Sequence, residues 1–361
     1  MDAYLGIMSG TSMDAIDVVA ACFDGKLKII SSYSHPIPPG VKQRLLSVTP
    51  QTSIHDISEL DCIMGRLFAD SANQLIKSHD HVNYPIKAIG CHGQTIYHNP
   101  IGANTNTIQI GDPNIIAAQT GFSVVADFRR KDMALGGQGA PLVPAFHNYL
   151  FSSSQTNRII LNIGGIANVS LLPTTGAIKG YDTGPGNTLM DLWIKKHHDK
   201  DYDAGGDWAR SGQVLPKLLN EMLEAPYFQI TPPKSTGKEL FNEAWLDGFF
   251  VDKKYAAEDI QATLNILTAT TIADSILRDM PDCTELVVCG GGGYNTLLME
   301  NLAGLLPNTK ISSSAEYGIA PELVEASAFA WLARQRILEL PGNIPSVTGA
   351  SSETVLGAVY V

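Results

Sequence analysis

GIMSGTSMDAID, residues 6–17, is the stretch from which the fold of this chain is read. An apolar segment runs into a turn of small residues, Ser9-Gly10-Thr11-Ser12, and the carboxylates of Asp14 and Asp17 follow. Successive backbone N–H groups in such a turn form a concavity that binds anions. The carboxylates suit a divalent cation that bridges them to phosphate. The stretch therefore predicts a phosphate-binding turn; the alternative is an ordinary β-turn, which uses the same residue types.

The turn leads into a second strand. Residues 16–23 are largely apolar and end at Asp24-Gly25, a dipeptide typical of hairpin turns. Neither of the common phosphate loops, G-x-x-x-x-G-K-[ST] or a helix-opening G-x-G-x-x-G, is present. The same design recurs in IILNIGGIANVSLL, residues 159–172, around Gly164-Gly165. Two such hairpins predict two related lobes, each offering one glycine turn to a shared ligand.

Composition is that of an enzyme-sized globular chain. With 361 residues, 44% of them apolar, about two domains are expected. The net charge of −11 argues against a general nucleic-acid or anionic-membrane surface. No run approaches 18 apolar residues and Met1-Asp2-Ala3-Tyr4 lacks a basic start, so a cytoplasmic protein is expected. The five cysteines show no C-x-x-C spacing and are expected to be reduced thiols.

Alternating strands and helices predict an α/β chain. Residues 128–130 are expected to carry the chain between the lobes. A third glycine turn, Gly290 to Gly293, follows a predicted buried strand at 285–289 and would let a flat adenosine lie against the backbone. The alternative for this turn is a strained strand-to-helix connection that needs positive φ. The other predicted elements are strands at 86–91 and 124–127 and helices along 60–75, 187–197, 213–224, 259–280, from 295, and 321–338.

A family resemblance covers essentially the whole chain. The chain resembles the anhydro-N-acetylmuramic acid kinases in GIMSGTSMDAID, CHGQT (91–95), ADFRRKDMALGGQGAPLVP (126–144), NIGGIANVS (162–170), YDTGPGN (181–187), PPKSTGKELF (232–241), CGGGGYN (289–295) and ELVEASAFAWLA (322–333). The resemblance implies a two-lobed α/β fold of the actin, hexokinase and Hsp70-like ATPases, with a duplicated mixed-sheet core and ATP in the interlobe cleft. Lobe I is expected at 1–128 plus 343–361, and lobe II at 129–342. Ala15 stands where the family usually has Gly.

The implied reaction is ATP-dependent. Water opens 1,6-anhydro-N-acetylmuramic acid while O6 takes the γ-phosphoryl group, which gives N-acetylmuramic acid 6-phosphate in the recycling of peptidoglycan. Because phosphate captures O6, the proton-donating acid of a glycosidase is not required. ATP and Mg²⁺ are the implied cofactors, an amino sugar is the implied substrate, and the family suggests a homodimer.

The implied catalytic base is Asp182, for which the alternative is a helix N-cap near Asn187. Asp14 and Asp17 are the candidate Mg²⁺ contacts, directly or through water. The expected sugar contacts are His92, Thr95, Asp127, Arg130 and Glu325. The alternative for Arg130 is a solvated cation on the surface. The expected nucleotide contacts are Gly10, Thr11, Ser12, Met13, Asp14, Ala15, Ile16, Asp17, Asn162, Gly164, Gly165, Gly184, Gly290, Gly291, Gly292, Gly293 and Asn295.

Two other functions stay open at this point. Another hexosamine kinase of the same superfamily predicts phosphorylation without incorporation of solvent oxygen at the anomeric carbon. An Hsp70-like nucleotide switch predicts ATP turnover that needs no sugar, although nothing in the 361 residues resembles a separate peptide-binding domain.

Overall fold

The computed structural model describes residues 1–10, 13–250 and 254–361, which divide into two compact units. Unit 1 contains Met1–Leu150 and Leu323–Val361, and unit 2 contains Phe151–Glu322. The chain therefore changes unit at Leu150–Phe151 and again at Glu322–Leu323. The expectation that residues 128–130 make the first crossing is wrong, because these residues lie within unit 1.

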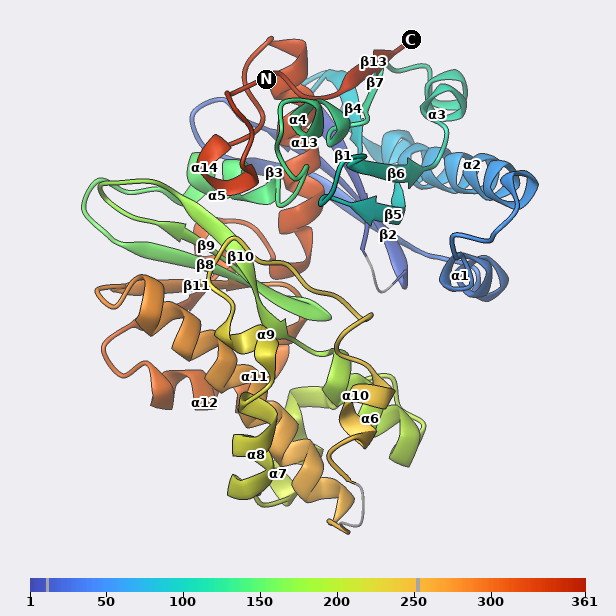
Figure 1. Cartoon of the computed structure of the whole chain (residues 1–361). Helices are drawn as coiled ribbons and strands as arrows, with labels where there is room; N and C mark the ends of the chain where they lie inside the picture. Colours follow the sequence, from blue (N-terminus) through green and yellow to red (C-terminus); the bar gives the residue numbers. More distant parts are fainter. Residues whose placement is uncertain (11–12, 251–253) are drawn as a thin grey trace. The chain divides into compact units, whose positions relative to one another are not determined.

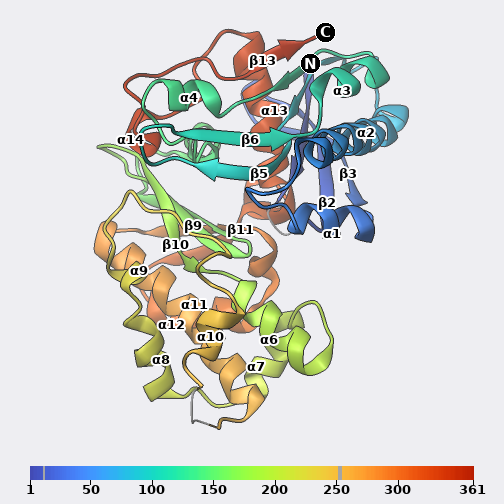
Figure 2. The same ribbon diagram turned by 45° about the vertical axis from the view of Figure 1, so that its right-hand side comes forward.

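Unit 1 is built on a six-stranded sheet of order β13-β7-β4-β1-β2-β3. β1, β2 and β3 are antiparallel neighbours, whereas β4 runs parallel to β1 and β7 parallel to β4. Figure 2 shows the separate two-stranded sheet of β5 and β6 in the same unit. The strands are β1 (Ala3–Ser9), β2 (Ala15–Cys22), β3 (Lys28–Pro36), β4 (Ile86–Cys91), β5 (Gln94–Asn99), β6 (Asn106–Ile110), β7 (Val124–Ala126) and β13 (Ala358–Tyr360).

The helices of unit 1 include the long α2, which packs on β2 and β3 through the apolar stripe that the sequence predicts. Ser53 starts this helix, since its side chain accepts a hydrogen bond from Asp56 N. The α-helices are α1 (Pro39–Leu46), α2 (Ile54–Ser78), α3 (Pro113–Thr120), α4 (Arg130–Ala134), α5 (Val143–Phe151, which ends across the boundary), α13 (Val324–Ile337) and α14 (Pro345–Thr348).

Unit 2 is built on a five-stranded sheet of order β10-β9-β8-β11-β12. α11 and α12 pack against each other along this sheet (Figure 1). The strands are β8 (Arg158–Ile163), β9 (Ile166–Leu172), β10 (Lys179–Pro185), β11 (Glu285–Cys289) and β12 (Lys310–Ser313). The helices are α6 (Thr188–His198), η1 (Ala204–Gly206), α7 (Asp207–Ser211), α8 (Pro216–Leu223), α9 (Pro226–Gln229), α10 (Glu243–Asp247), α11 (Ala257–Asp279), η2 (Gly291–Tyr294), α12 (Thr296–Leu305), η3 (Ser314–Tyr317) and η4 (Pro321–Leu323), the last of which ends across the boundary.

The two sheets repeat one topology. The order β3-β2-β1-β4-β7 in unit 1 corresponds strand for strand to β10-β9-β8-β11-β12 in unit 2. The directions correspond as well, with an antiparallel hairpin on one side and parallel strands on the other. A long helix, α2 or α11, precedes the first of these parallel strands in each unit. The expected duplication of a strand–turn–strand design is therefore confirmed within each sheet.

Helix α13 packs closely on the sheet of unit 1. A Cβ atom added to Gly6 in β1 would lie 1.8 Å from the Ala326 carbonyl oxygen, and one on Gly90 in β4 would lie 2.0 Å from the Phe329 carbonyl oxygen. Such distances mean that the helix backbone rests directly on the two strands. For this reason residues 323–342 belong to unit 1, a boundary that differs from the lobe limits expected from the sequence.

The predicted elements are mostly found within a few residues of their expected bounds. The strands at 86–91 and 285–289 agree at both ends, whereas the late helix is preceded by the separate short helix η4. All five cysteines are free thiols, as expected. Within the described ranges, the search for a helix long and apolar enough to cross a membrane found none.

Substitution Gly6→Ala is expected to destabilise the protein by about 3 kcal/mol, because the added methyl group forces α13 away from β1. The matched control is Gly304→Ala on the exposed end of α12, where an added Cβ meets nothing within 4 Å. That variant is expected to gain about 0.5–1 kcal/mol from helix propensity. Urea denaturation measures both changes, and equal stability of Gly6→Ala and the parent chain contradicts the packing described.

Candidate active site

The first glycine turn lies between β1 and β2. The two strands pair up to Ser9 opposite Ile16, and Met13 N donates a hydrogen bond to the Gly10 carbonyl oxygen at 3.1 Å. Met13 has φ of 55°, a left-handed conformation that is uncommon for a residue with a side chain. Thr11 and Ser12, two of the expected nucleotide contacts, lie outside the described residues.

The residues that follow this turn have different surroundings. The Asp14 carboxylate is 64% exposed and pairs with the Lys42 ammonium from α1. Asp17 is half-buried in β2, Ala15 pairs with Pro36 of β3, and the side chain of Ile16 belongs to the core. Within the ranges that the structure describes, no three His, Cys, Asp or Glu side chains are grouped closely enough to hold a metal ion by themselves.

A buried hydrogen bond links this turn to the CHGQT motif. Ser9 Oγ donates to Gln94 Oε1 at 2.7 Å, and both side chains are buried. Next to Gln94, the half-buried Thr95 accepts a hydrogen bond from Gln109 Nε2 at 3.1 Å across β5 and β6. Sequence reasoning selected Thr95 and missed Gln94, although the motif contains both residues. The available signal was an amide side chain three residues after the predicted strand at 86–91.

His92, in the same motif, is held by Arg129. The guanidinium nitrogens Nε and Nη2 of Arg129 lie 3.2 and 2.8 Å from His92 Nε2, and the His92 ring packs 4.7 Å from that of Phe329. Burial, together with the charge of Arg129, holds the pKa of His92 well below its usual range. Nε2 must accept the hydrogen bonds, so the imidazole is neutral and carries its proton on Nδ1. His92 is therefore a neutral imidazole that accepts from Arg129, and among the described residues its buried Nδ1 has no hydrogen-bond partner.

The two adjacent arginines, Arg129 and Arg130, have different surroundings. Arg130 is 66% exposed and forms an ion pair with Asp127 at 2.8 Å. Arg129 is half-buried, and the loss of water around it lowers the pKa of its guanidinium to about 10 despite the opposing charges of Glu325 and Asp132. The expected contact Glu325, in the first turn of α13, thus lies in the electrostatic field of Arg129. Asp127 has φ of 59°, a strained conformation of the kind that gathers at functional sites.

Asp132 fixes the loop that receives Arg129. Its carboxylate is fully buried and accepts hydrogen bonds from Gly139 N, Asn343 Nδ2 and Thr348 Oγ1, at 2.8, 2.7 and 2.7 Å. The Gly139 carbonyl oxygen in turn accepts a bond from Arg129 Nη1 at 2.8 Å. Sequence reasoning missed Asp132, because its partners come from the far end of the chain. The carboxylate joins the C-terminal segment to the loop that orients Arg129.

The second glycine turn, Gly164-Gly165, lies between β8 and β9 in unit 2. Three backbone N–H groups at the start of α6 donate to it: Asn187 to the Gly164 carbonyl at 2.9 Å, and Gly186 and Thr188 to the Gly165 carbonyl at 2.8 and 3.1 Å. With both carbonyl oxygens engaged, the turn is held in one conformation. Such a turn can present its own N–H groups to an anion.

The candidate base Asp182 lies in β10, at the edge of the same sheet. Its Oδ2 accepts a hydrogen bond from Thr236 N at 2.9 Å, and its backbone N–H and C=O bond to the Lys234 carbonyl and the Tyr227 hydroxyl at 3.3 and 2.8 Å. Burial raises the pKa of Asp182 to about 6; Glu239 adds to this shift, while the Thr236 N–H and the Lys234 charge oppose it. The N-cap alternative is wrong, because the N-cap of α6 is Asn187.

The third glycine turn, after β11, uses two of its glycines for packing. A Cβ atom on Gly290 would lie 2.4 Å from Asn162 Oδ1, and one on Gly292 would lie 2.2 Å from Ile163 Cγ2. Gly290 also has φ of 80°, as the alternative reading requires, whereas an added Cβ on Gly291 meets nothing within 4 Å. The turn thus lies against the end of β8, beside the expected contact Asn162, and keeps one glycine open.

Two further expected nucleotide contacts have structural roles. Asn295 is the N-cap of α12, since its Oδ1 accepts a hydrogen bond from Leu298 N at 3.1 Å. Gly184 is buried in β10, where an added Cβ would lie 2.7 Å from the Phe228 ring. A hollow of about 460 Å³ does adjoin the third turn, and its lining includes Gly293, Tyr294 and Pro321.

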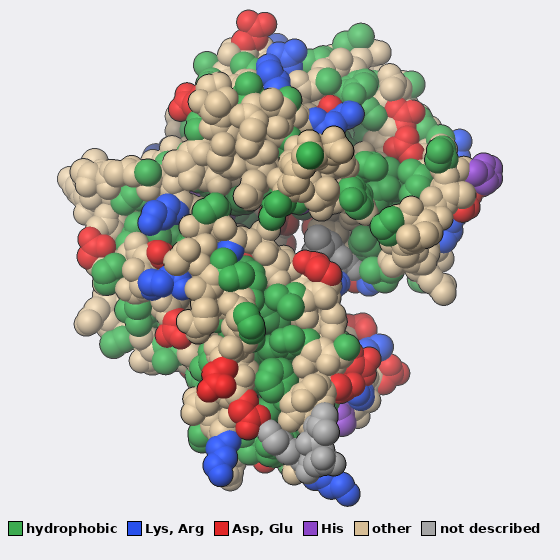
Figure 3. Space-filling view, viewed as in Figure 1, with side chains coloured by type: hydrophobic (Ala, Val, Ile, Leu, Met, Phe, Trp, Pro, Cys, Tyr) green, Lys and Arg blue, Asp and Glu red, His purple; other side chains and the backbone are tan. Residues whose placement is uncertain are grey.

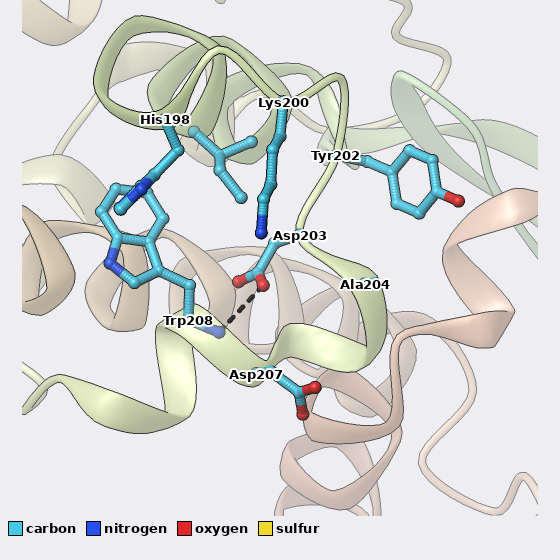
Figure 4. A pocket seen from close by; sticks show the side chains of 8 residues that line it. His198, Lys200, Tyr202, Asp203, Ala204, Asp207 and Trp208 are labelled. Carbon is cyan, nitrogen blue, oxygen red and sulfur yellow. Dashed lines mark hydrogen bonds between the residues drawn. The ribbon is translucent and has the colours of Figure 1, made fainter.

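A smaller hollow of about 180 Å³ lies between α6 and α7 and is lined in part by His198, Lys200 and Trp208 (Figure 4). Its buried carboxylate, Asp203, accepts hydrogen bonds from Trp208 N and Ala209 N, both at 2.9 Å. Asp203 therefore serves to hold the start of α7. On the face shown in Figure 3, Lys and Arg side chains are scattered among acidic ones, as the net charge of −11 leads one to expect.

Two mixed α/β sheets of one topology, each with a glycine turn in its antiparallel hairpin, are the design of the actin, hexokinase and Hsp70-like ATPases. These features define a protein with a duplicated, two-sheet α/β fold of this class. The particular family follows from the sequence: the model of the anhydro-N-acetylmuramic acid kinases matches residues 2–361, and the chain belongs to that family. It is an enzyme that uses ATP to phosphorylate this anhydro sugar in peptidoglycan recycling.

Solved structures with similar folds are much more distant in sequence. The activator of 2-hydroxyisocaproyl-CoA dehydratase from Clostridium difficile, with bound ADPNP, is 14% identical, with 92% of this chain and 97% of that chain covered and a TM-score of 0.43. The (R)-2-hydroxyglutaryl-CoA dehydratase component A from Acidaminococcus fermentans is 12% identical, with 91% and 96% covered and a TM-score of 0.48. A ROK family glucokinase from Streptomyces griseus, in complex with glucose and AMPPNP, is 14% identical, with 92% and 99% covered and a TM-score of 0.43. Because all three TM-scores are below 0.5, nothing about the site is inferred from them.

The different surroundings of the two arginines predict different costs of replacing them. Arg129→Met is expected to destabilise the protein by about 2–4 kcal/mol, because it leaves buried hydrogen-bond acceptors without a donor. Arg130→Met, the matched control, is expected to cost less than about 1 kcal/mol, since its ion pair is exposed. Urea denaturation compares the two, and a larger loss for Arg130→Met contradicts the assignment.

Proposed function

We propose that Asp182 is the general base of the kinase reaction. The observation that carries this proposal is the Asp182 carboxylate itself, held by the Thr236 N–H at 2.9 Å at the edge of the sheet of unit 2. The pKa of Asp182, raised to about 6, makes the carboxylate a stronger base than an exposed aspartate while leaving it ionised at neutral pH. Both properties suit the removal of a proton from water.

The proposed step balances without a separate acid. Asp182 takes a proton from water as the water oxygen bonds to the anomeric carbon. The bond from that carbon to O6 breaks, and O6 bonds to the γ-phosphorus of ATP as the bond to the β,γ-bridging oxygen breaks. The products are N-acetylmuramic acid 6-phosphate and ADP, and Asp182 then loses its proton to solvent. Since O6 leaves onto phosphorus, no side chain has to protonate it.

The nucleotide is proposed to bind through the glycine turns. The first turn, from Gly10 to Asp14, and the second, Gly164-Gly165, offer backbone N–H groups to phosphate oxygens. Mg²⁺, when bound, neutralises phosphate charge, and Asp14 and Asp17 are the residues proposed to hold it, directly or through water. The hollow beside Gly293 and the open position at Gly291 support adenosine contact at the third turn.

The sugar contacts stay a proposal in unit 1. His92 supplies a neutral N–H group, and the exposed Arg130, held by Asp127, is free to turn toward the lactyl carboxylate of the substrate. Thr95 and Glu325 are proposed to contact sugar hydroxyl or amide groups. A cytoplasmic location and a homodimer, which the family resemblance and sequence suggest, stay predictions.

The pH dependence of the reaction follows from Asp182. Because the base must be ionised, kcat is expected to fall about tenfold per pH unit below about 6, which is the raised pKa of Asp182. Asp182→Asn is expected to lower kcat by at least about 100-fold while the affinity for ATP stays within about twofold. Rates between pH 5 and 9 and calorimetric titration with ATP check both values; an active Asp182→Asn variant contradicts the role.

The same pKa shift predicts that the Asp182→Asn variant is more stable than the parent chain. A carboxyl group with a raised pKa binds its proton more tightly in the folded state, so its contribution to the stability declines as pH rises from the unfolded value toward about 6. Asp182→Asn, which removes the buried charge, is expected to stabilise the protein at pH 7.5 by about 1–3 kcal/mol. Thermal unfolding at pH 4 and pH 7.5 tests this, with the larger gain expected at the higher pH.

The source of the product oxygen tests the overall reaction. In ¹⁸O-labelled water with Mg²⁺-ATP and the anhydro sugar, mass spectrometry is expected to find one labelled oxygen on the anomeric carbon and none in the sugar phosphate group. Unlabelled N-acetylmuramic acid 6-phosphate in the same water is the control for exchange at that carbon. Phosphorylated sugar without label points to the rival kinase reaction, and labelled inorganic phosphate with intact sugar points to an ATPase switch.

A further inference from the structure

Two polar side chains lie on one flank of the second glycine turn. A methyl group added to Gly165 would lie 2.7 Å from Thr188 Oγ1 and 3.9 Å from Lys238 Cε. Thr188 is the first residue of α6, and Lys238 belongs to the segment between α9 and α10. Side chains from two separate parts of unit 2 thus meet at the backbone of one glycine.

The Thr188 hydroxyl is not used in a hydrogen bond within the described part of the chain. Its oxygen is buried, and among the residues that the structure describes it has no hydrogen-bond partner. A buried hydroxyl without a partner costs free energy, and a native protein keeps one where a ligand or water completes the bond. The neighbouring backbone shows that the place is otherwise well ordered, because Thr188 N donates to the Gly165 carbonyl oxygen at 3.1 Å.

Lys238 brings a cation to the same place. Lys238 is exposed, and its Cε, the atom that carries the ammonium group, is the one that lies 3.9 Å from the methyl group added to Gly165. The chain next to it is anchored, because two residues earlier Thr236 N holds the Asp182 carboxylate and Lys234 O accepts from Asp182 N. The position of Lys238 is therefore tied, through the backbone, to the position of the proposed base.

We propose that Lys238 and Thr188 together bind a β- or γ-phosphoryl oxygen of the nucleotide at the Gly164-Gly165 turn. The chemistry is that of other phosphate loops, in which backbone N–H groups, a hydroxyl and a lysine converge on one anion. The pairing also accounts for Gly165, since a side chain there would fill the space between the two groups. This inference rests on the proposed function. It adds a phosphate-binding lysine whose neighbouring backbone is hydrogen-bonded to the proposed base.

The test compares nucleotides of different length. Calorimetric titration with Mg²⁺-AMPPNP and with AMP is made on the full chain and on Lys238→Met. AMPPNP affinity and kcat/KM are expected to fall about 10- to 100-fold, the range for one charge-assisted hydrogen bond, while AMP affinity is unchanged. Lys238→Arg is expected to recover most of the loss. Lys217→Met, an exposed lysine on α8, is the control and is expected to match the parent chain.

A second pair of variants tests the hydroxyl. Thr188→Val is expected to weaken AMPPNP binding by about 10- to 100-fold, the loss expected for one hydrogen bond to a charged group, whereas Thr188→Ser keeps the parent affinity. Circular dichroism confirms that each variant is folded. Unchanged AMPPNP binding and kcat/KM in folded Lys238→Met overturns the inference and leaves the proposed function intact. Failure of the parent chain to bind AMPPNP at all overturns both.

Discussion

Both units depend on one constraint: two antiparallel strands pair across a short turn of small residues. β1 pairs with β2, and β8 with β9, in complete register up to the turn. Each hairpin takes the middle of its sheet, with parallel strands added on one side. In unit 2, the pairing strands are largely buried, and hydrogen bonds from the start of α6 to the Gly164 and Gly165 carbonyls give the turn at their end a fixed place.

Two segments hold the groups around the second hairpin in place: the start of α6 and the segment that contains Thr236. The N–H groups at the start of α6 occupy the turn carbonyls, and the Thr236 N–H holds the Asp182 carboxylate. Burial disfavours the ionised form of Asp182, and the hydrogen bond and the Lys234 charge partly stabilise it. The pKa of Asp182 is therefore raised to about 6. A carboxylate that is weakly disfavoured but still ionised is what a base near neutral pH requires.

In unit 1, a chain of hydrogen bonds connects the polar groups from Asp132 to His92. Asp132 holds the loop at Gly139, whose carbonyl receives Arg129, which in turn fixes the tautomer of His92. Neighbouring arginines look alike in a sequence, but Arg129 is half-buried and Arg130 is exposed. Phe329 of α13, residues 324–337, packs on the His92 ring that Arg129 holds.

The sequence by itself determined the two hairpins, the α/β class and the family, because these depend on patterns of apolar, glycine and acidic residues that can be recognised without knowledge of distant contacts. Tertiary structure alone decided the unit boundaries, the contact of Arg129 with His92, and the approach of Thr188 and Lys238 to Gly165. It also showed that Gly290 and Gly292 are required by packing against β8. The physical reason is the same in each case: which side chain loses water depends on segments far away in the chain, and no local pattern encodes that.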